Sequence, residues 1–467
     1  MSRRKGTAEG IDLRRVAEPL PSLRDRMAGD PPLSARDGVA APEAGPEWPP
    51  LVDGGLRERA WDAVLTVAEE LATVLPGTAA AGDAGLAGGD PGLALFFQSL
   101  YAATGAEDAA AAARALLDRA VGAMQLPGPS LCLYRGAPGV AWTLAHLRTR
   151  GAADHGEVLA TVDRAVLAAL RAEPGPAAFD LARGLVGLGV YALERLPAPA
   201  AAEALDAVVE RLEQAVERTA EGAAWFKPPG MLPRRQRGRL PRGVYDLGMA
   251  HGAAGVIALL ARVVDAGVAA GRAGDLLDRA VRRLRTHELP AGSPSRYPAR
   301  IAPGQAPGPA RLAWCCGDPG VGVALLAAAR ARRDAELEAH ARGVLLAAAR
   351  RAPEESGVRD APFCHGASGL AHLFHRAWRA TGEAALRGAA VRWLRFALDL
   401  PAPEGSRSRF PFHVPGNGGA TWSDRPGVLE GAAGVGLVLV AAVSPVPPAW
   451  DRIFLADVGA SPGRAAQ

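Results

Sequence analysis

The sequence predicts an all-α protein, an α/α toroid of seven inner and seven outer helices built from seven helical-hairpin repeats. Three observations predict this fold: a recurring Gly-x-x-Gly phrase, an apolar helical segment after each phrase, and no strand-like alternation between them. Glycine accounts for 56 of the 467 residues. This is about 12%, against a usual level near 7%, and much of the excess lies in the repeated phrase.

The first glycine of each phrase stands at position 89, 136, 184, 252, 317, 366 or 431. Phrases such as "HGAAGVIALL" (251–260) and "HGASGLAHLF" (365–374) lead into proline-free helical runs, and stretches such as 274–287 supply second helices. Glycine permits the tight turn that must precede each inner helix. Seven such αα-hairpins can close into a ring, with an open solenoid as the alternative. Closure would bring the glycine turns to one end, where they would form a basin.

The remaining segments differ in composition from the repeats. Residues 1–55 are rich in Pro, Gly and charge and are expected to form a disordered tail, and 457–467 a flexible C-terminal tail. The toroid is expected over 56–456. Two irregular stretches, 225–246 and 289–309, interrupt the repeats and lead into turns with reactive residues, which predicts loops on the rim of the basin.

Charge and hydropathy narrow the class of protein. The net charge of +4 gives no bulk polycation, so nucleic-acid binding is not expected. There is no apolar run of about 18 residues and no secretory signal, which predicts a cytoplasmic protein without a membrane span. Three of the four cysteines fall in two short phrases, a pattern typical of a site and not of a disulfide framework.

Two repeat turns carry candidate metal ligands. The fifth contains "RLAWCCGDPG" with Cys315 and Cys316, and the sixth contains "FCHG" with Cys364 and His365. If these turns face one basin, Cys315, Cys364 and His365 can bind one zinc ion and leave its fourth position open, as in catalytic zinc sites. The alternatives are cysteines that merely pack in the core, and a closed structural site with Cys316 as the fourth ligand.

Three further polar residues lie beside the glycine turns. His251 begins the fourth phrase and is a candidate proton-transfer group, although a single histidine can also be a hydrogen-bonded core residue. Asp180 can orient an imidazole or cap the following helix. Arg311 can stabilise developing negative charge near the metal or be solvated at the end of its loop.

The phrases "DLARGLVG", "AHGAAG", "RLAWCCG", "FCHGASG" and "VLEGAAGVGLVL" together resemble the lanthipeptide cyclase family, the LanC-like proteins, over roughly residues 56–456. The resemblance implies a sevenfold toroid with one zinc ion per chain, bound by Cys315, Cys364 and His365. It also implies active-site roles for His251, Asp180 and Arg311. Family members close thioether rings by adding cysteine thiols to dehydroalanine or dehydrobutyrine. Cys316 departs from the family, which often has Tyr at this position.

The resemblance therefore implies a stand-alone cyclase whose partner is a dehydrated precursor peptide. A separate dehydratase is expected, and a transporter can join it in a synthetase complex. One alternative is an enzyme that adds glutathione or another small thiol to dehydroamino acids. Another is a non-catalytic zinc toroid that scaffolds a peptide-modification complex.

The loop 227–242 carries six basic residues and no acidic one. They are Lys227, Arg234, Arg235, Arg237, Arg239 and Arg242. Its prolines prevent it from continuing either flanking helix, which predicts an extended flap on the rim. The flap is either a solvated surface or a site that captures an acidic stretch of the precursor or of the dehydratase.

Overall fold

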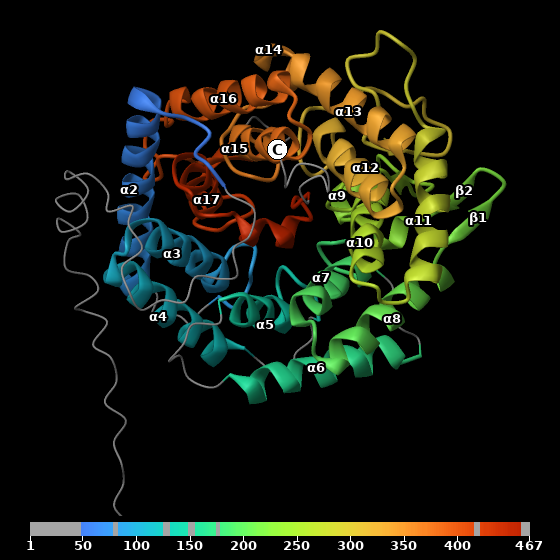
Figure 1. The fold of residues 1–467 in the computed structure, drawn as a ribbon, viewed down its shortest axis with the longest axis horizontal. Coiled ribbons are helices and arrows are strands. Elements are labelled where there is room, and N and C mark those ends of the chain that lie inside the picture. The colour runs from blue at the N-terminus through green and yellow to red at the C-terminus, as the bar shows by residue number, and fades with distance from the viewer. Residues whose placement is uncertain are drawn as a thin grey trace, which may run out of the picture.

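Two concentric layers of helices form a closed ring (Figure 1). The computed structural model describes residues 48–77, 83–124, 131–147, 155–173, 178–414 and 421–458. The inner layer consists of α3 (Asp90–Thr104), α5 (Ala137–His146), α7 (Leu185–Arg195), α10 (Ala253–Asp265), α12 (Asp318–Arg332), α15 (Ala367–Thr381) and α17 (Ala432–Val443). The outer layer consists of α2 (Gly54–Gly77), α4 (Glu107–Ala123), α6 (Gly156–Arg171), α8 (Pro199–Gln214), α11 (Ala270–Arg285), α13 (Ala335–Arg350) and α16 (Ala384–Asp399).

The ring closes between the two ends of the chain. Each inner helix contacts the next in chain order, and α17 contacts α3. Six inner helices pack against the outer helix that follows them, whereas α17 packs against α2 from the start of the chain. The predicted α/α toroid is confirmed. One hairpin, however, is assembled from the chain termini and not from consecutive helices.

The two layers differ in hydrophobicity because they differ in exposure. Every residue of α17 is buried, and the inner helices are apolar on most faces. The outer helix α11 is amphipathic: Leu277 and Leu284 lie on its buried face, and Arg282 belongs to its polar face. Inner helices that contact neighbours on all sides therefore tolerate apolar residues throughout, while the outer helices need one charged face.

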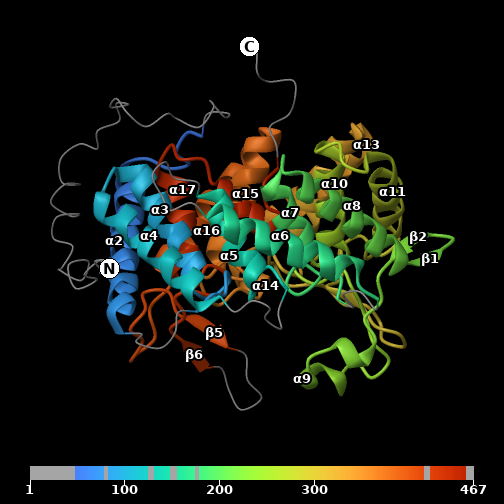
Figure 2. The ribbon, with the colours of Figure 1, turned by 90° about the horizontal axis from the view of Figure 1, so that it is seen from below.

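Short strands and helices occur between the long helices of the ring. Three antiparallel ribbons, which the sequence analysis did not predict, pair β1 (Glu217–Thr219) with β2 (Gly222–Ala224), β3 (Tyr245–Asp246) with β4 (Arg300–Ile301), and β5 (Phe412–Val414) with β6 (Thr421–Ser423). The short helices are η2 (Pro229–Met231), α9 (Arg234–Arg237), α14 (Pro353–Ser356) and η3 (Ala449–Phe454). The β5–β6 ribbon and α9 project from the same end of the toroid (Figure 2). The strands of all three ribbons are too short to produce a recognisable alternation of apolar and polar residues in the sequence.

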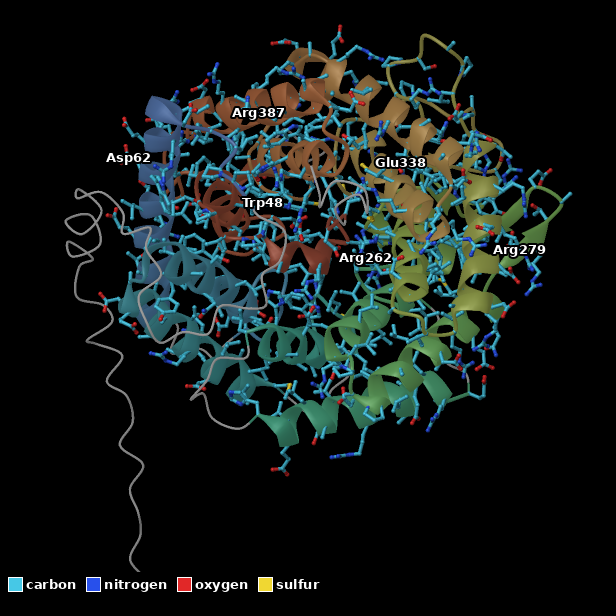
Figure 3. The ribbon with its side chains drawn as sticks, viewed as in Figure 1. Trp48, Asp62, Arg262, Arg279, Glu338 and Arg387 are labelled. Carbon is cyan, nitrogen blue, oxygen red and sulfur yellow. The ribbon has the colours of Figure 1, made fainter. Side chains whose placement is uncertain are left out.

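The two ends of the described chain pack into the ring. Trp48 and Leu51 are buried against α17, and the Trp48 indole donates to the Ala441 carbonyl (Figure 3). The packed chain thus begins before residue 56, where the sequence analysis placed its start. Residues 1–47 and 459–467 lie outside the described residues, so the expected tails there stay predictions.

The segment η3 fills the centre of the ring. The Trp314 indole donates to the Phe454 carbonyl at 2.9 Å, and the Phe363 ring stacks on the Phe454 ring at 4.1 Å between centroids. Trp314 and Phe363 each precede a cysteine of the candidate metal site. The end of the chain therefore supports the two turns that carry the site.

Candidate metal centre and active site

The Gly-x-x-Gly phrase is required by a close approach within each turn. A Cβ atom at Gly320 would lie 2.1 Å from the Trp314 carbonyl oxygen, and one at Gly369 would lie 2.0 Å from the Phe363 carbonyl oxygen. Only glycine allows each inner helix to begin this close to the backbone of the turn that precedes it. The residues just before the first glycine are thereby held at the same place in each turn.

Backbone hydrogen bonds connect the turns around the ring. They involve the residue two positions before the first glycine of each turn, and they run from Ala250 N to Cys315 O, Cys315 N to Cys364 O, Cys364 N to Leu429 O, Leu429 N to Ala87 O, and Ala87 N to Tyr134 O. Six of the seven turns are joined in this way. In the described chain, no backbone hydrogen bond connects the third turn, which contains Asp180, to either neighbouring turn.

This connection brings together three of the predicted site residues. Cys315, Cys364 and His365 each offer one ligand atom, and these atoms lie within 4.8 Å of one another. Cys364 is buried, and the other two are partly buried. The predicted convergence of two thiols and an imidazole is present, and these are donors that zinc prefers.

The electrostatics of the cluster fit a cation. Burial, followed by the charges of Arg311, His413 and Arg425, lowers the pKa of His365 to about 4. Its imidazole is therefore neutral and can act as a ligand at neutral pH. A hydrogen bond with Cys316 lowers the pKa of Cys315, but the hydrogen bond with Cys364 and burial outweigh it and raise that pKa well above the usual value. A bound dication would supply the positive charge that these thiols need to ionise.

Cys316 and Asp360 lie next to this cluster. The hydrogen bond to Cys315, together with burial, raises the pKa of the Cys316 thiol well above its usual value. The three-residue metal group does not include Cys316. Asp360, which the sequence analysis missed, is buried with its Oδ2 atom 4.0 Å from His365 Nε2. Burial raises the pKa of Asp360 to about 6. An acid near the start of a helix resembles an ordinary cap, so the sequence held no distinct signal for it.

Of the two roles that the sequence left open, Asp180 is placed to orient an imidazole, whereas no side-chain hydrogen bond caps α7 (Leu185–Arg195). Its Oδ1 accepts a hydrogen bond from the Arg183 amide at 2.9 Å, and its Oδ2 lies 3.2 Å from His251 Nδ1. Burial alone would raise the pKa of Asp180, but the hydrogen bond with His251 and the charge of Lys227 hold it well below its usual range. The structure thus brings Asp180 and His251 into contact.

The third partner of Asp180 is Lys227, which was not among the predicted site residues. Lys227 Nζ lies 2.6 Å from Asp180 Oδ2, and the side chain is buried. The sequence analysis placed Lys227 among six loop cations without a local partner. For Lys227 this was wrong, because a buried carboxylate from the third turn, far away in sequence, pairs with it.

The Arg311 side chain contacts the metal cluster through the main-chain carbonyl of His365. Its Nη2 donates to the Gly357 carbonyl at 2.6 Å and to the His365 carbonyl at 3.2 Å. Its Nε is buried without a partner among the described residues. The fourth turn also packs closely on the fifth, since a Cβ at Gly248 would lie 2.2 Å from the Cys315 carbonyl oxygen. The turns that carry His251 and Cys315 are therefore neighbours.

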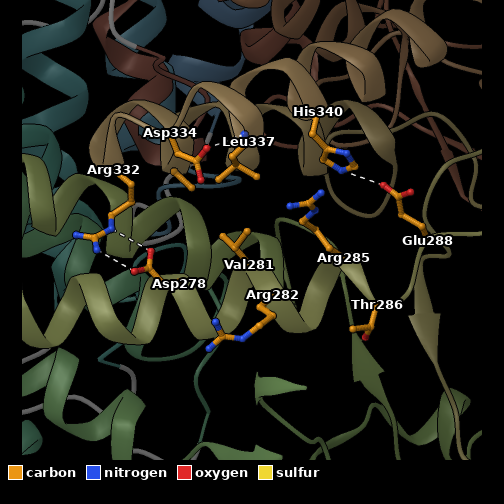
Figure 4. A pocket seen from close by; sticks show the side chains of 11 residues that line it. Asp278, Val281, Arg282, Arg285, Thr286, Glu288, Arg332, Asp334, Leu337 and His340 are labelled. Atoms are coloured by element: carbon orange, nitrogen blue, oxygen red, sulfur yellow. Dashed lines mark hydrogen bonds and ion pairs between the residues drawn. The ribbon is translucent and has the colours of Figure 1, made fainter. Parts of the chain in front are cut away.

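A hollow on the outer wall offers a different location for a ligand. It has a volume of about 620 Å³ and lies between α11 and α13, where Arg332 pairs with Asp278 and His340 pairs with Glu288 (Figure 4). No residue of the metal cluster lines it.

A closed α/α toroid with a Cys₂His cluster at its glycine turns defines the class of protein, and the comparisons agree. The model of the lanthionine synthetase C-like protein family matches residues 81–455, so the chain belongs to that family. Among solved structures, nisin cyclase superposes with a TM-score of 0.70 and 18% identity, covering 86% of this chain and 98% of that chain. No curated protein matches the sequence significantly. No helix in the described ranges is long and apolar enough to cross a membrane.

Proposed function

We propose that this protein is a zinc-dependent lanthipeptide cyclase that forms (methyl)lanthionine rings in a dehydrated precursor peptide. The observation that carries this proposal is the convergence of Cys315, Cys364 and His365 in a chain of the lanthionine synthetase C-like family. The Asp180–His251 pair on the nearby turns provides a group that can transfer protons.

The reaction joins a cysteine thiol to dehydroalanine or dehydrobutyrine. The S–H bond breaks, a C–S bond forms at the β-carbon, and the electron pair of the alkene moves toward the carbonyl as an enolate. The α-carbon then takes a proton, so no oxidant or reductant is needed. A zinc ion held by Cys315, Cys364 and His365 would lower the pKa of the substrate thiol, which otherwise stays mostly protonated near neutral pH.

Residues of this chain transfer the proton and stabilise the negative charge that develops on the substrate. The Asp180 carboxylate faces His251 Nδ1 and so assigns a proton to that nitrogen, while the described residues give Nε2 no partner. Nε2 can then accept or deliver a proton at the substrate, a role that suits an imidazole near neutral pH. Arg311, held beside His365, places a fixed positive charge where the enolate develops.

The substrate must come from a reaction that removes water from Ser or Thr side chains of the same peptide. We propose that a separate dehydratase catalyses this step and that the two enzymes, with a transporter, form a synthetase complex in the cytoplasm. The test is to incubate the purified protein with a chemically dehydrated, cysteine-containing peptide. Ring closure leaves the mass unchanged, so the loss of alkylatable thiol measures it.

The same assay separates the alternatives. Added glutathione gives a product heavier by one glutathione if the protein is a small-thiol adduct enzyme, whereas a cyclase consumes the thiol of the peptide itself. A protein that binds zinc yet leaves all peptide thiols alkylatable, with and without glutathione, would be a scaffold. That result would overturn the proposed function.

A further inference from the structure

Lys227 has an unusual place in this chain. It is one of two lysines in the sequence, and the other, Lys5, precedes the described residues. All other basic side chains of the toroid are arginine or histidine. The single lysine is also 7% exposed, although lysine is rarely buried without a partner. Its position therefore calls for a function that a compact ammonium group serves better than a guanidinium.

The surroundings of Lys227 satisfy its charge completely. Nζ lies 2.6 Å from Asp180 Oδ2 and 2.5 Å from the His251 carbonyl oxygen. The third side is covered by the Phe179 ring, whose centroid is 5.0 Å away. Two acceptors and one aromatic face match three N–H bonds. The ammonium group is thus held in a fixed position between the third and fourth turns.

This position matters because the third turn has no backbone link to its neighbours in the described chain. Asp180 belongs to the third turn and His251 to the fourth. Lys227 joins the two, since it binds the carboxylate of one and the main chain of the other. Lys227 itself is fixed by two backbone hydrogen bonds with Val244, each 2.9 Å long, which close the base of the loop 228–243.

We propose that Lys227 is the positioning residue of the proton-transfer pair: it bridges the two turns and neutralises Asp180, so that His251 is held in register with the metal cluster. This inference rests on the proposed function for its kinetic consequence only. Without Lys227, Asp180 would be a buried carboxylate whose sole charged partner is the His251 ring, and the ring would be drawn toward its doubly protonated form. The charge of Asp180 also acts on the buried phenol of Tyr134, whose pKa burial and nearby negative charge raise well above its usual value.

The test compares Lys227→Met, which keeps the apolar stem, with Lys227→Arg, which keeps the charge. Arg300→Met is the matched control, because Arg300 is exposed on β4, outside the described contacts of the site. We expect Lys227→Met to retain zinc and KM while kcat falls about 10- to 100-fold, as for other groups that orient a reacting residue. Lys227→Arg should keep more of kcat than Lys227→Met, and Arg300→Met should match the wild type.

A double variant isolates the route of the effect. If Lys227 acts through Asp180, adding Lys227→Met to Asp180→Asn should cost no further activity. Additive losses would show that Lys227 acts elsewhere and would overturn the inference. So would equal kcat values for Lys227→Met and the wild type.

A spectroscopic measurement keeps the inference testable without catalysis. In ¹⁵N-histidine-labelled protein, the His251 ring signals can be assigned by their loss in His251→Asn. These signals should move toward the doubly protonated form in Lys227→Met and stay unchanged in Arg300→Met. Unmoved signals would refute the role of Lys227 even if the wild type cyclises peptides. Shifted signals in a protein without cyclase activity would instead refute the proposed function alone.

Discussion

The Cys315 amide donates a hydrogen bond to the Cys364 carbonyl at 3.2 Å, so the two candidate thiolate ligands are neighbours through the main chain. They occupy the same position of the repeat, two residues before the first glycine of their turns. This bond belongs to a series that passes from turn to turn, so the ring holds the main chains of the two cysteines side by side. Their thiols then lie close enough to share one metal ion with His365.

Replacing Cys364 should remove the metal. We expect about one equivalent of zinc in the purified wild-type protein and nearly none in Cys364→Ala, because two donors remain where tetrahedral zinc usually has three protein ligands. Cys132→Ala is the control, since Cys132 is buried and lies outside the three-residue group. Metal analysis after dialysis against a weak chelator measures both. Full zinc retention in Cys364→Ala would contradict the assignment.

Cys316 should be dispensable for metal binding. Its thiol contacts that of Cys315, but it is not one of the three residues whose ligand atoms converge. Cys316→Ser is therefore expected to keep zinc and much of the cyclisation rate. A loss of zinc equal to that in Cys315→Ala would instead indicate a closed structural site with four protein ligands.

His251 should affect the rate and not the metal. We expect His251→Asn to retain zinc but to slow ring closure by about 10²- to 10⁴-fold, the usual contribution of a positioned proton-transfer group. Single-turnover measurements with a dehydrated peptide separate this step from product release. An unchanged single-turnover rate would remove His251 from the mechanism.

Much of the fold was predictable because the repeat imposes its own constraints. Each Gly-x-x-Gly phrase marks a turn where a Cβ would collide with a carbonyl, so the periodicity of glycine reports the number of inner helices directly. The pairing of α17 with α2 was not predictable in the same way. It joins segments from opposite ends of the chain, and no local pattern specifies such a contact.

The residues of the candidate site also divide into those that a local pattern predicts and those that it does not. Cys315, Cys364 and His365 could be predicted because they stand beside the repeated glycines. Lys227 and Asp360 do not stand beside these glycines. Lys227 belongs to a loop, and Asp360 lies at the start of the turn that carries Cys364. From the local sequence, Lys227 is expected to be one of several solvated cations in a loop. Only the long-range contact with Asp180 reveals that it is buried and paired.

An ion pair between Asp451 of η3 and Arg376 of α15 should make the fold sensitive to acid. Burial alone would raise the pKa of Asp451, but the charge of Arg376 and the hydrogen bond from His372 lower it to about 2. Its folded pKa is thus below the unfolded value of about 3.9. The stabilisation is present above pH 4 and is lost as the pH falls toward 2.

Asp451→Asn should therefore lower the thermal midpoint at pH 7, because it leaves Arg376 with an uncompensated, partly buried charge. A loss of about 3–5 kcal/mol is typical for breaking one side of a buried pair. The difference from the wild type should shrink as the pH falls from 4 toward 2. Equal midpoints at pH 7 would contradict this account.

The basic loop 227–242 is a candidate for substrate capture. Lys227 does not take part, because it is buried and paired with Asp180. Arg237 donates to the Leu232 and Gly230 carbonyls and Arg242 to the Pro303 carbonyl, while no acidic side chain of the described chain pairs with Arg234 or Arg239. The side chain of Arg235 lies outside the described residues. Arg234 and Arg239 are exposed. We propose that they attract an acidic stretch of the precursor or of the dehydratase.

Arg234→Ser combined with Arg239→Ser should weaken binding of an acidic precursor peptide while leaving the zinc content intact. Exposed charges separated by more than about 8 Å are largely screened at physiological ionic strength. The wild type should therefore lose affinity between low and physiological salt, and the double variant should lose less, because part of the charge that salt screens is already gone. Arg114→Ser combined with Arg164→Ser, two exposed changes on the outer helices α4 and α6, controls for net charge. If the double variant and the wild type bind with the same affinity and the same salt dependence, the loop is only a solvated surface.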